Sequence, residues 1–102
     1  MKKKIPEVRY RASRVCRVLG NPTAYEVVHL LKNKKRTARE LSDILGVAVP
    51  TVSEVLRSLR QIDLIRYEVK WRKRVYWLKY RDVTTLLGML ERLIRKIGVK
   101  EI

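Results

Sequence analysis

Residues 37–59 read TARELSDILGVAVPTVSEVLRSL, and their pattern identifies the fold of the chain. Thr37 and Glu40 have the spacing of a capping box, in which each side chain binds a free backbone N–H at a helix start. The first helix should therefore open at Thr37 and continue until Gly46, where glycine lets the chain turn sharply. A second helix is expected to begin near Val49 and Pro50, because proline is tolerated in a first turn. Two short helices joined by a tight glycine turn form a helix-turn-helix.

The apolar residues of both helices recur at the three- and four-residue spacing of one helix face. The first helix is expected to bury Leu41, Ile44 and Leu45, and the second, over residues 49–61, to bury Val52, Val55, Leu56 and Leu59.

Two further helices are expected before this stretch. The earlier runs from Glu7 to Leu19 and is ended by Gly20; its apolar stripe is Val8, Ala12, Val15, Cys16 and Leu19. The next is capped by Asn21 and begins with Pro22, a residue favoured at the first helical position. It runs to Leu31, and its inward face is Ala24, Val27, Val28 and Leu31.

After the helix-turn-helix the apolar period changes from helical to two, which predicts a β-hairpin over residues 65–79. The hairpin turn lacks Asn-Gly, so we expect a longer loop than the tightest type. Asp82 is expected to cap a last helix over residues 82–97. The whole chain, 1–102, is predicted to be one mainly α domain with a small β-hairpin wing, a winged helix-turn-helix of order ααααββα.

The charge of the chain predicts a polyanionic partner. Its 102 residues include 25 Lys and Arg against 10 Asp and Glu, a net charge of +15. Nucleic acid is favoured, because each neutralised phosphate releases condensed counterions, and an anionic membrane surface is the competing polyanion. No apolar run is long enough to span a membrane, and no signal peptide follows the start at Met1, so we expect a cytoplasmic, nucleoid-associated protein that does not bind membranes.

Side chains suited to chemistry are scarce. Cys16 and His29 are each alone, so we expect no metal site within one chain, no cofactor and no enzymatic activity. Cys16 is interpreted as a small buried hydrophobe, with an intersubunit thiol pair as the alternative. The few amide side chains and the charged content of 34% are typical of a thermophile.

The order and spacing of several segments resemble the ArsR-like regulators. These segments are RVLGNPT at 17–23, ELSDILG at 40–46, TVSEVL at 51–56 and DLIR at 63–66, and the resemblance covers Arg11 to Leu78. It implies a homodimeric repressor that dimerises through its first and last helices. The metal-sensing members of that family carry a Cys-x-Cys-Asp group, and the matching positions here are Thr37, Arg39 and Glu40. Because the thiolates are absent, metal sensing is not carried over.

The resemblance implies that the helix over 49–61 lies in the DNA major groove and reads its sequence. The residues expected to contact base edges are Ala48, Val49, Pro50, Thr51, Ser53, Glu54 and Arg57. The apolar groups suit thymine methyls and Glu54 could accept from cytosine. The alternative is that Ala48 and Val49 only complete the turn and that Glu54 is solvated. Ala48 stands where the family usually has a serine N-cap, which leaves helix-end donors for a phosphate.

Cations around the helix-turn-helix predict contacts to the DNA backbone. The wing residues expected there are Lys70, Trp71, Arg72, Lys73 and Arg74, and the phosphate anchors are Arg36, Thr37 and Arg39. Trp71 has two interpretations, packing on the hairpin stem or lying against a sugar edge. Residues 1–6 form either a basic arm that follows the DNA backbone or a disordered terminus.

The apolar stripe of the last helix exceeds what one small core needs and predicts a dimer. The expected interface residues are Val8, Ala12, Val15, Leu86, Leu90, Leu93, Ile94 and Ile97. A dimer would place two reading helices about 34 Å apart, on half-sites one DNA turn apart. The favoured function is sequence-specific regulation of transcription through double-stranded DNA, with any effector unknown. A non-specific architectural DNA binder and a protein-interaction module are the alternatives.

Overall fold

The computed structural model describes residues 4–98, which form five helices and three strands. Their order is α1 (Glu7–Leu19), α2 (Pro22–Leu31), β1 (Arg36–Thr37), α3 (Ala38–Leu45), α4 (Val49–Gln61), β2 (Ile65–Lys70), β3 (Lys73–Leu78) and α5 (Asp82–Ile97). The expected winged helix-turn-helix is confirmed, with one addition, the two-residue strand β1. It pairs antiparallel with β3, so the sheet has the order β1-β3-β2.

Local hydrogen bonds fix the helix starts that the sequence predicts. The Asn21 side chain accepts from the N–H groups of Thr23 and Ala24, at 2.9 and 3.1 Å. Thr37 and Glu40 form both halves of the capping box, at 3.1 and 2.8 Å. These contacts satisfy backbone donors that a helix start leaves free, so α2 and α3 begin at defined residues.

The turn between α3 and α4 depends on Gly46, whose φ is 67°. Glycine adopts this left-handed conformation without a steric penalty. The Gly46 N–H donates to the Ser42 carbonyl at 2.9 Å, and the Ser42 hydroxyl donates to the Val47 carbonyl at 2.5 Å. These two short-range hydrogen bonds hold the turn between the two helices.

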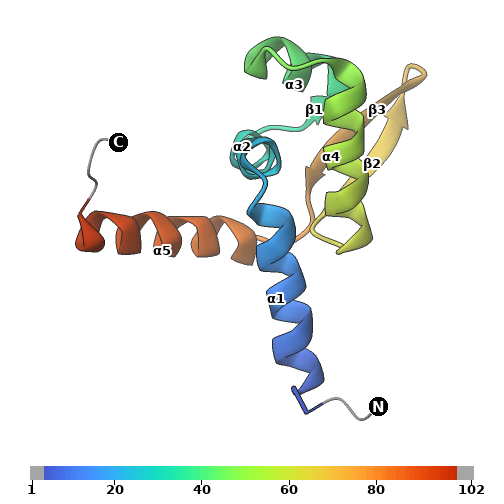
Figure 1. Ribbon diagram of the computed structural model, residues 1–102. Coiled ribbons are helices and arrows are strands. Elements are labelled where there is room, and N and C mark those ends of the chain that lie inside the picture. Colours follow the sequence, from blue (N-terminus) through green and yellow to red (C-terminus); the bar gives the residue numbers. More distant parts are fainter. Residues whose placement is uncertain (1–3, 99–102) are drawn as a thin grey trace.

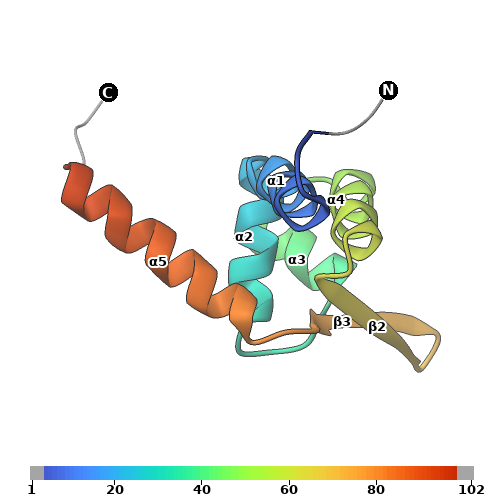
Figure 2. The same ribbon diagram turned by 90° about the horizontal axis from the view of Figure 1, so that it is seen from below.

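The core lies around α2, which contacts α1, α3, α4 and β3 (Figure 1). The predicted inward faces of α2 and α4 are both buried. The three-stranded sheet covers this helical layer on one side, and Tyr76 of β3 is buried against it (Figure 2). Helices α1 and α5 project from this body in different directions.

Several details of the sequence prediction are wrong. Ile44 is 51% exposed and Cys16 is exposed in the single chain, so neither belongs to the core. Both lie on faces that no other described element covers. Asp82 is the first residue of α5 and does not cap it, because the N-cap position is Arg81.

The wing turn is also shorter than expected. Lys70 pairs with Lys73, so only Trp71 and Arg72 connect β2 and β3. Their φ angles are 52° and 64°. Positive φ at both central residues is the signature of a type I′ turn, whose twist matches that of paired strands. The hairpin therefore keeps the tightest turn although neither residue is glycine or asparagine.

No helix within residues 4–98 is long and apolar enough to cross a membrane. Of the expected basic arm, Met1, Lys2 and Lys3 lie outside the described residues, and Lys4 is exposed.

Candidate nucleic-acid interface

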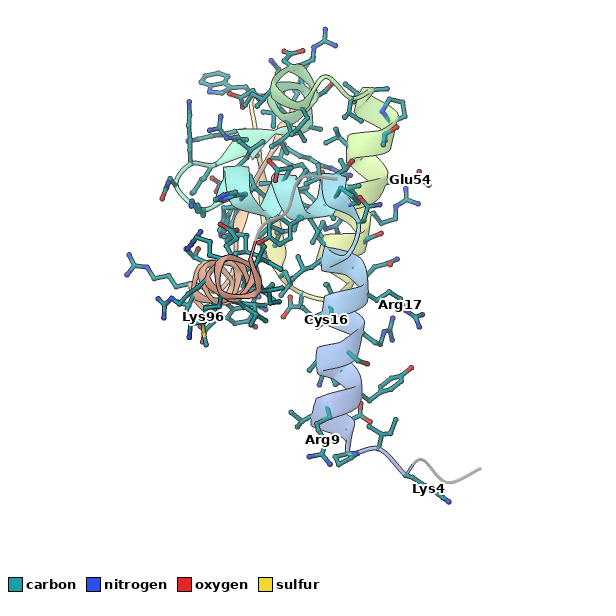
Figure 3. All side chains as sticks on the ribbon, turned by 60° about the vertical axis from the view of Figure 1, so that its left-hand side comes forward. Lys4, Arg9, Cys16, Arg17, Glu54 and Lys96 are labelled. Atoms are coloured by element: carbon teal, nitrogen blue, oxygen red, sulfur yellow. The ribbon has the colours of Figure 1, made fainter. Side chains whose placement is uncertain are left out.

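Helix α4 has two faces of opposite character. Val52, Val55, Leu56 and Leu59 are buried, whereas Pro50, Thr51, Ser53, Glu54 and Arg57 are exposed. Val49 is half-buried, so its side chain serves packing as well as the surface. The Glu54 side chain projects away from the body of the domain (Figure 3). The expected reading residues are thus accessible without any rearrangement of the core.

The start of α4 lacks a side-chain cap. Ala48 occupies the N-cap position with φ −59° and ψ 143°, and its methyl group cannot accept a hydrogen bond. Pro50 contributes no N–H. The remaining first-turn donors carry the positive end of the helix dipole, which favours an anion.

A basic groove of about 510 Å³ lies between α4 and the wing. Its lining includes five cationic side chains and no carboxylate. The lining residues are Thr37, Ala38, Arg39, Ser53, Arg57, Arg60, Lys73, Arg74 and Tyr76. A concave surface of one charge sign concentrates ions of the opposite sign, so the groove is suited to a phosphate backbone.

Two tyrosines of the wing contact cations from both sides of the groove, Arg60 of α4 and Arg74 of β3. The guanidinium carbons of Arg60 and Arg74 each lie 4.6 Å from the ring centre of Tyr67. The Tyr67 and Tyr76 rings are 5.4 Å apart. A hydrogen bond to Tyr76 raises the pKa of Arg74 above its ordinary value. Stacking of this kind restricts the arginine side chains before any ligand arrives.

Sequence reasoning missed Arg60, Tyr67 and Tyr76 as members of this surface. Arg60 follows Arg57 by three residues, which places both on neighbouring helix positions. Tyr67 and Tyr76 are cross-strand partners in the hairpin. The spacing of the arginines could have identified Arg60, but the tyrosine pairing depends on a strand register that the sequence did not reveal.

The three predicted phosphate anchors have different surroundings. Arg39 is exposed and lines the groove beside Thr37. Arg36 is half-buried, and its Nε donates to the Leu30 carbonyl at 3.1 Å. Arg36 therefore ties the end of α2 to β1, and only the other two anchors join the groove.

The wing tip extends beyond the groove. Lys70, Trp71 and Arg72 are exposed, and Trp71 is 91% exposed. The tip lies away from α4 at the end of the hairpin. Trp71 therefore does not pack on the hairpin stem within the single chain.

Metal-ligating side chains do not cluster within residues 4–98: no group of three or more His, Cys, Asp or Glu could hold an ion. At the positions where the resemblance would place metal ligands, Thr37 and Glu40 bind each other's backbone.

An apolar surface follows α5 on the side that the domain leaves uncovered. Val83 and Leu87 are buried, whereas the other apolar residues of this helix are 38–68% exposed. The exposed set, here called the α5 face, is Leu86, Met89, Leu90, Leu93, Ile94 and Ile97. On α1, Val8 is 79% exposed, Ala12 is exposed and Val15 is half-buried.

Residues 21–67 match the family model described as bacterial regulatory protein, arsR family, so the resemblance seen in the sequence is confirmed for that segment. A comparison with curated proteins gives no match.

Solved structures share the fold over nearly the whole chain. HlyU from Vibrio cholerae is 20% identical with a TM-score of 0.79, covering 88% of this chain and 98% of its own. NolR from Sinorhizobium fredii is 20% identical with a TM-score of 0.79, covering 92% and 97%. The DNA-binding domain of Mb0332 from Mycobacterium bovis, described as homodimeric, is 17% identical with a TM-score of 0.79, covering 93% and 92%.

Proposed function

Because residues 21–67 match the ArsR family of regulators, we propose that this protein is a DNA-binding transcriptional regulator. The observation that carries the proposal is the basic groove beside the exposed face of α4. In this arrangement α4 enters the major groove of DNA, and its exposed residues from Thr51 to Arg57 meet base edges. Specificity comes from this helix, because contacts to phosphates position a protein but do not read sequence.

The groove and the wing tip hold the DNA backbone. Arg39, Arg57 and Arg60 contact phosphates from the helical side, and Lys73 and Arg74 contact them from the wing side. Lys70, Trp71 and Arg72 reach further along the duplex, toward the minor groove. Unpaired donors at the start of α4 bind one more phosphate.

The active form is a homodimer that reads an inverted repeat. Pairing of the α5 face, with α1 of the partner, would remove several half-exposed leucines and isoleucines from water. Two copies of α4 would then lie about 34 Å apart, one DNA turn, and the complex acts as a repressor in the cytoplasm, at the nucleoid.

Fluorescence anisotropy with a labelled genomic operator fragment tests the DNA interface. We expect Arg57→Gln and Arg74→Gln each to weaken DNA binding. Each lost phosphate contact should also lower the slope of log affinity against log salt concentration by about 1. Arg9→Gln is the matched control, because Arg9 is exposed near the start of α1, far from α4. Equal losses in all three variants would contradict a localised interface.

An architectural, non-specific binder is the second candidate, and the net charge of +15 favours it. Excess random DNA separates the two functions. A regulator stays bound to its operator when random DNA is added. An architectural protein is displaced from the fragment in proportion to the random DNA added.

A further inference from the structure

A second cavity lies beside the end of β3, away from the basic groove. It has a volume of about 270 Å³ and is lined by the segment after α2, by β3 and by the start of α5. Tyr76 lines the groove, and Trp77 lines this cavity. Neighbouring residues of a strand point to opposite faces, so β3 presents Tyr76 to the groove on one face and Trp77 to this cavity on the other.

The chemistry of the cavity combines an apolar floor with a cationic rim. Leu31, Leu78 and Trp77 contribute apolar surface. Four cations surround it, and no lining residue is acidic. The cations are Lys32, Lys34, Lys35 and Arg81. An apolar floor with a few convergent polar groups is the usual composition of a small-molecule site.

Lys35 is already held in position at the rim. Its Nζ lies 4.7 Å from the centre of the Trp77 ring and 3.4 Å from Oε1 of Glu68. Both partners of this ion pair are about half exposed, at 55% and 43%. An exposed pair of this kind is weak, so a ligand carboxylate can replace Glu68 at Lys35. Lys32 also experiences the charge of Glu91, and Lys34 that of Glu40, which leaves Arg81 as the least compensated cation.

We propose that this cavity binds a small organic anion of the aromatic carboxylate class. The flat ring would stack against Trp77 and the leucines, and the carboxylate would accept charge-assisted hydrogen bonds from the rim. The volume is just below the range of about 300–1,000 Å³ typical of drug-sized ligands, which favours a ligand with a single ring. A DNA phosphate is disfavoured, because the cavity shares no lining residue with the basic groove and none with α4.

Occupation of the cavity would also regulate DNA binding. The ligand contacts the segment that leads into α3, the wing strand β3 and the base of α5. Any change in the relative positions of these elements alters how α4 and the wing meet DNA, provided that the ligand binds one arrangement better than another. This regulatory part rests on the proposed function, whereas ligand binding does not.

Calorimetric titration of the full chain with benzoate tests the site without DNA. We expect saturable binding of one benzoate per chain and no saturable binding of neutral benzamide. The double variant Lys34→Gln/Arg81→Gln should lower the affinity for benzoate at least tenfold, and the control Arg9→Gln should leave this affinity unchanged. Trp77→Leu keeps all the charges and is checked for folding by circular dichroism. It should lower the affinity for benzoate several-fold.

Three results would overturn the binding site: no saturable benzoate binding, equal losses in Arg9→Gln and the double variant, or inorganic phosphate binding as tightly as benzoate. A fourth comes from DNA binding without benzoate. If Lys34→Gln/Arg81→Gln weakens it as much as Arg57→Gln, the cavity contacts DNA and the proposal is wrong.

The regulatory part has its own readout. Benzoate should change the DNA affinity of the wild-type chain at least threefold and leave the double variant unaffected. If benzoate binds without changing DNA affinity, the regulatory role is refuted while the site remains. If no DNA is bound at all, the proposed function fails, and the calorimetric result still decides the ligand site.

Discussion

Trp71 and Arg72 at the wing tip both adopt a backbone conformation that ordinary residues avoid. With φ at 52° and 64°, each lies in the left-handed region. This conformation costs an L-residue other than glycine roughly 1–2 kcal/mol. The pairing of β2 with β3 compensates, because a type I′ turn matches the twist of the two strands.

Replacing Arg72 with glycine should relieve this strain. We expect Arg72→Gly to raise the free energy of unfolding by about 1 kcal/mol, measured by urea titration. The same variant should weaken DNA binding, since a cation is lost at the tip. Lys70→Gly is the control, and it should lower stability because Lys70 lies in a strand with negative φ. A less stable Arg72→Gly would show that the turn is not strained.

Tyr25 of α2 holds α5 through a single hydrogen bond. Its hydroxyl donates to Oε2 of Glu91 at 2.6 Å. Burial and this contact raise the pKa of Tyr25 to about 12 from the ordinary value of 10.0. The same hydrogen bond lowers the pKa of Glu91 below 4.5.

The pKa of Tyr25 provides a direct test of this contact. We expect Glu91→Gln to bring it part of the way back toward 10, because the burial that also raises it remains. The pKa is followed by the ultraviolet absorbance of tyrosinate, and Tyr25→Phe should remove the ionisation with a pKa of about 12. An unchanged titration in Tyr25→Phe would assign that ionisation to another residue.

The sign of the stability change follows from the two shifts. The pKa of Tyr25 is raised in the folded protein. Its contribution to the free energy of unfolding is therefore complete below pH 10 and is lost as the pH rises toward 12. The folded pKa of Glu91 is lowered, so its contribution is present above pH 4.5 and is lost on acidification.

At the scale of elements, α3 depends on the capping box at its start. The Thr37 hydroxyl accepts from the Glu40 N–H, and the Glu40 carboxylate accepts from the Thr37 N–H. This backbone contact lowers the pKa of Glu40. The box therefore weakens as the pH falls below the ordinary carboxyl value of 4.5.

Thr37→Ala should destabilise the domain by about 1 kcal/mol, because one orphan N–H loses its acceptor. Thr37→Ser retains the hydroxyl and should remain close to wild type. Thermal unfolding without DNA measures both, which separates the helix cap from any role of Thr37 in the groove. Equal stability of the alanine and serine variants would mean that the cap contributes nothing.

The strand β1 could not be predicted from the sequence. Two residues are too short to display an alternating pattern, and Arg36 and Thr37 form a strand only because the edge of β3 is available beside them. The hairpin differs, since its period of two is visible in the sequence and only the length of its turn was wrong.

At the scale of the whole molecule, α5 is only partly used by its own domain. Val83 and Leu87 join the core, and the six residues of the α5 face stay exposed. Helix α5 also projects away from the body of the domain, which leaves room for a second copy beside it.

Leu93→Glu should disrupt the proposed dimer, because a carboxylate at the centre of the α5 face would be desolvated without a partner. We expect sedimentation to give the mass of a monomer, and operator affinity to fall with it. Thr85→Glu introduces the same charge at an exposed position of α5 outside the face, and should remain dimeric. If wild type sediments as a monomer at concentrations that bind DNA, the dimer proposal is wrong.

The helices, the helix-turn-helix and the basic character of the protein could be predicted from the order of the amino acids. Capping residues such as Asn21 and Thr37, the turn residue Gly46 and the helical spacing of leucines all act within a few residues of chain, so they can be recognised locally. The exposed face of α4 could be predicted for the same reason, since it follows from the buried face of one helix.

The contacts between elements became visible only in the folded protein. The fold brings Arg60 of α4 and Arg74 of β3 to the same Tyr67 ring, and it uses Arg36 to tie β1 to α2. It left Cys16 and Ile44 outside the core that their spacing predicted. Apolar spacing shows which face of a helix prefers burial, but whether that face is covered depends on elements distant in sequence.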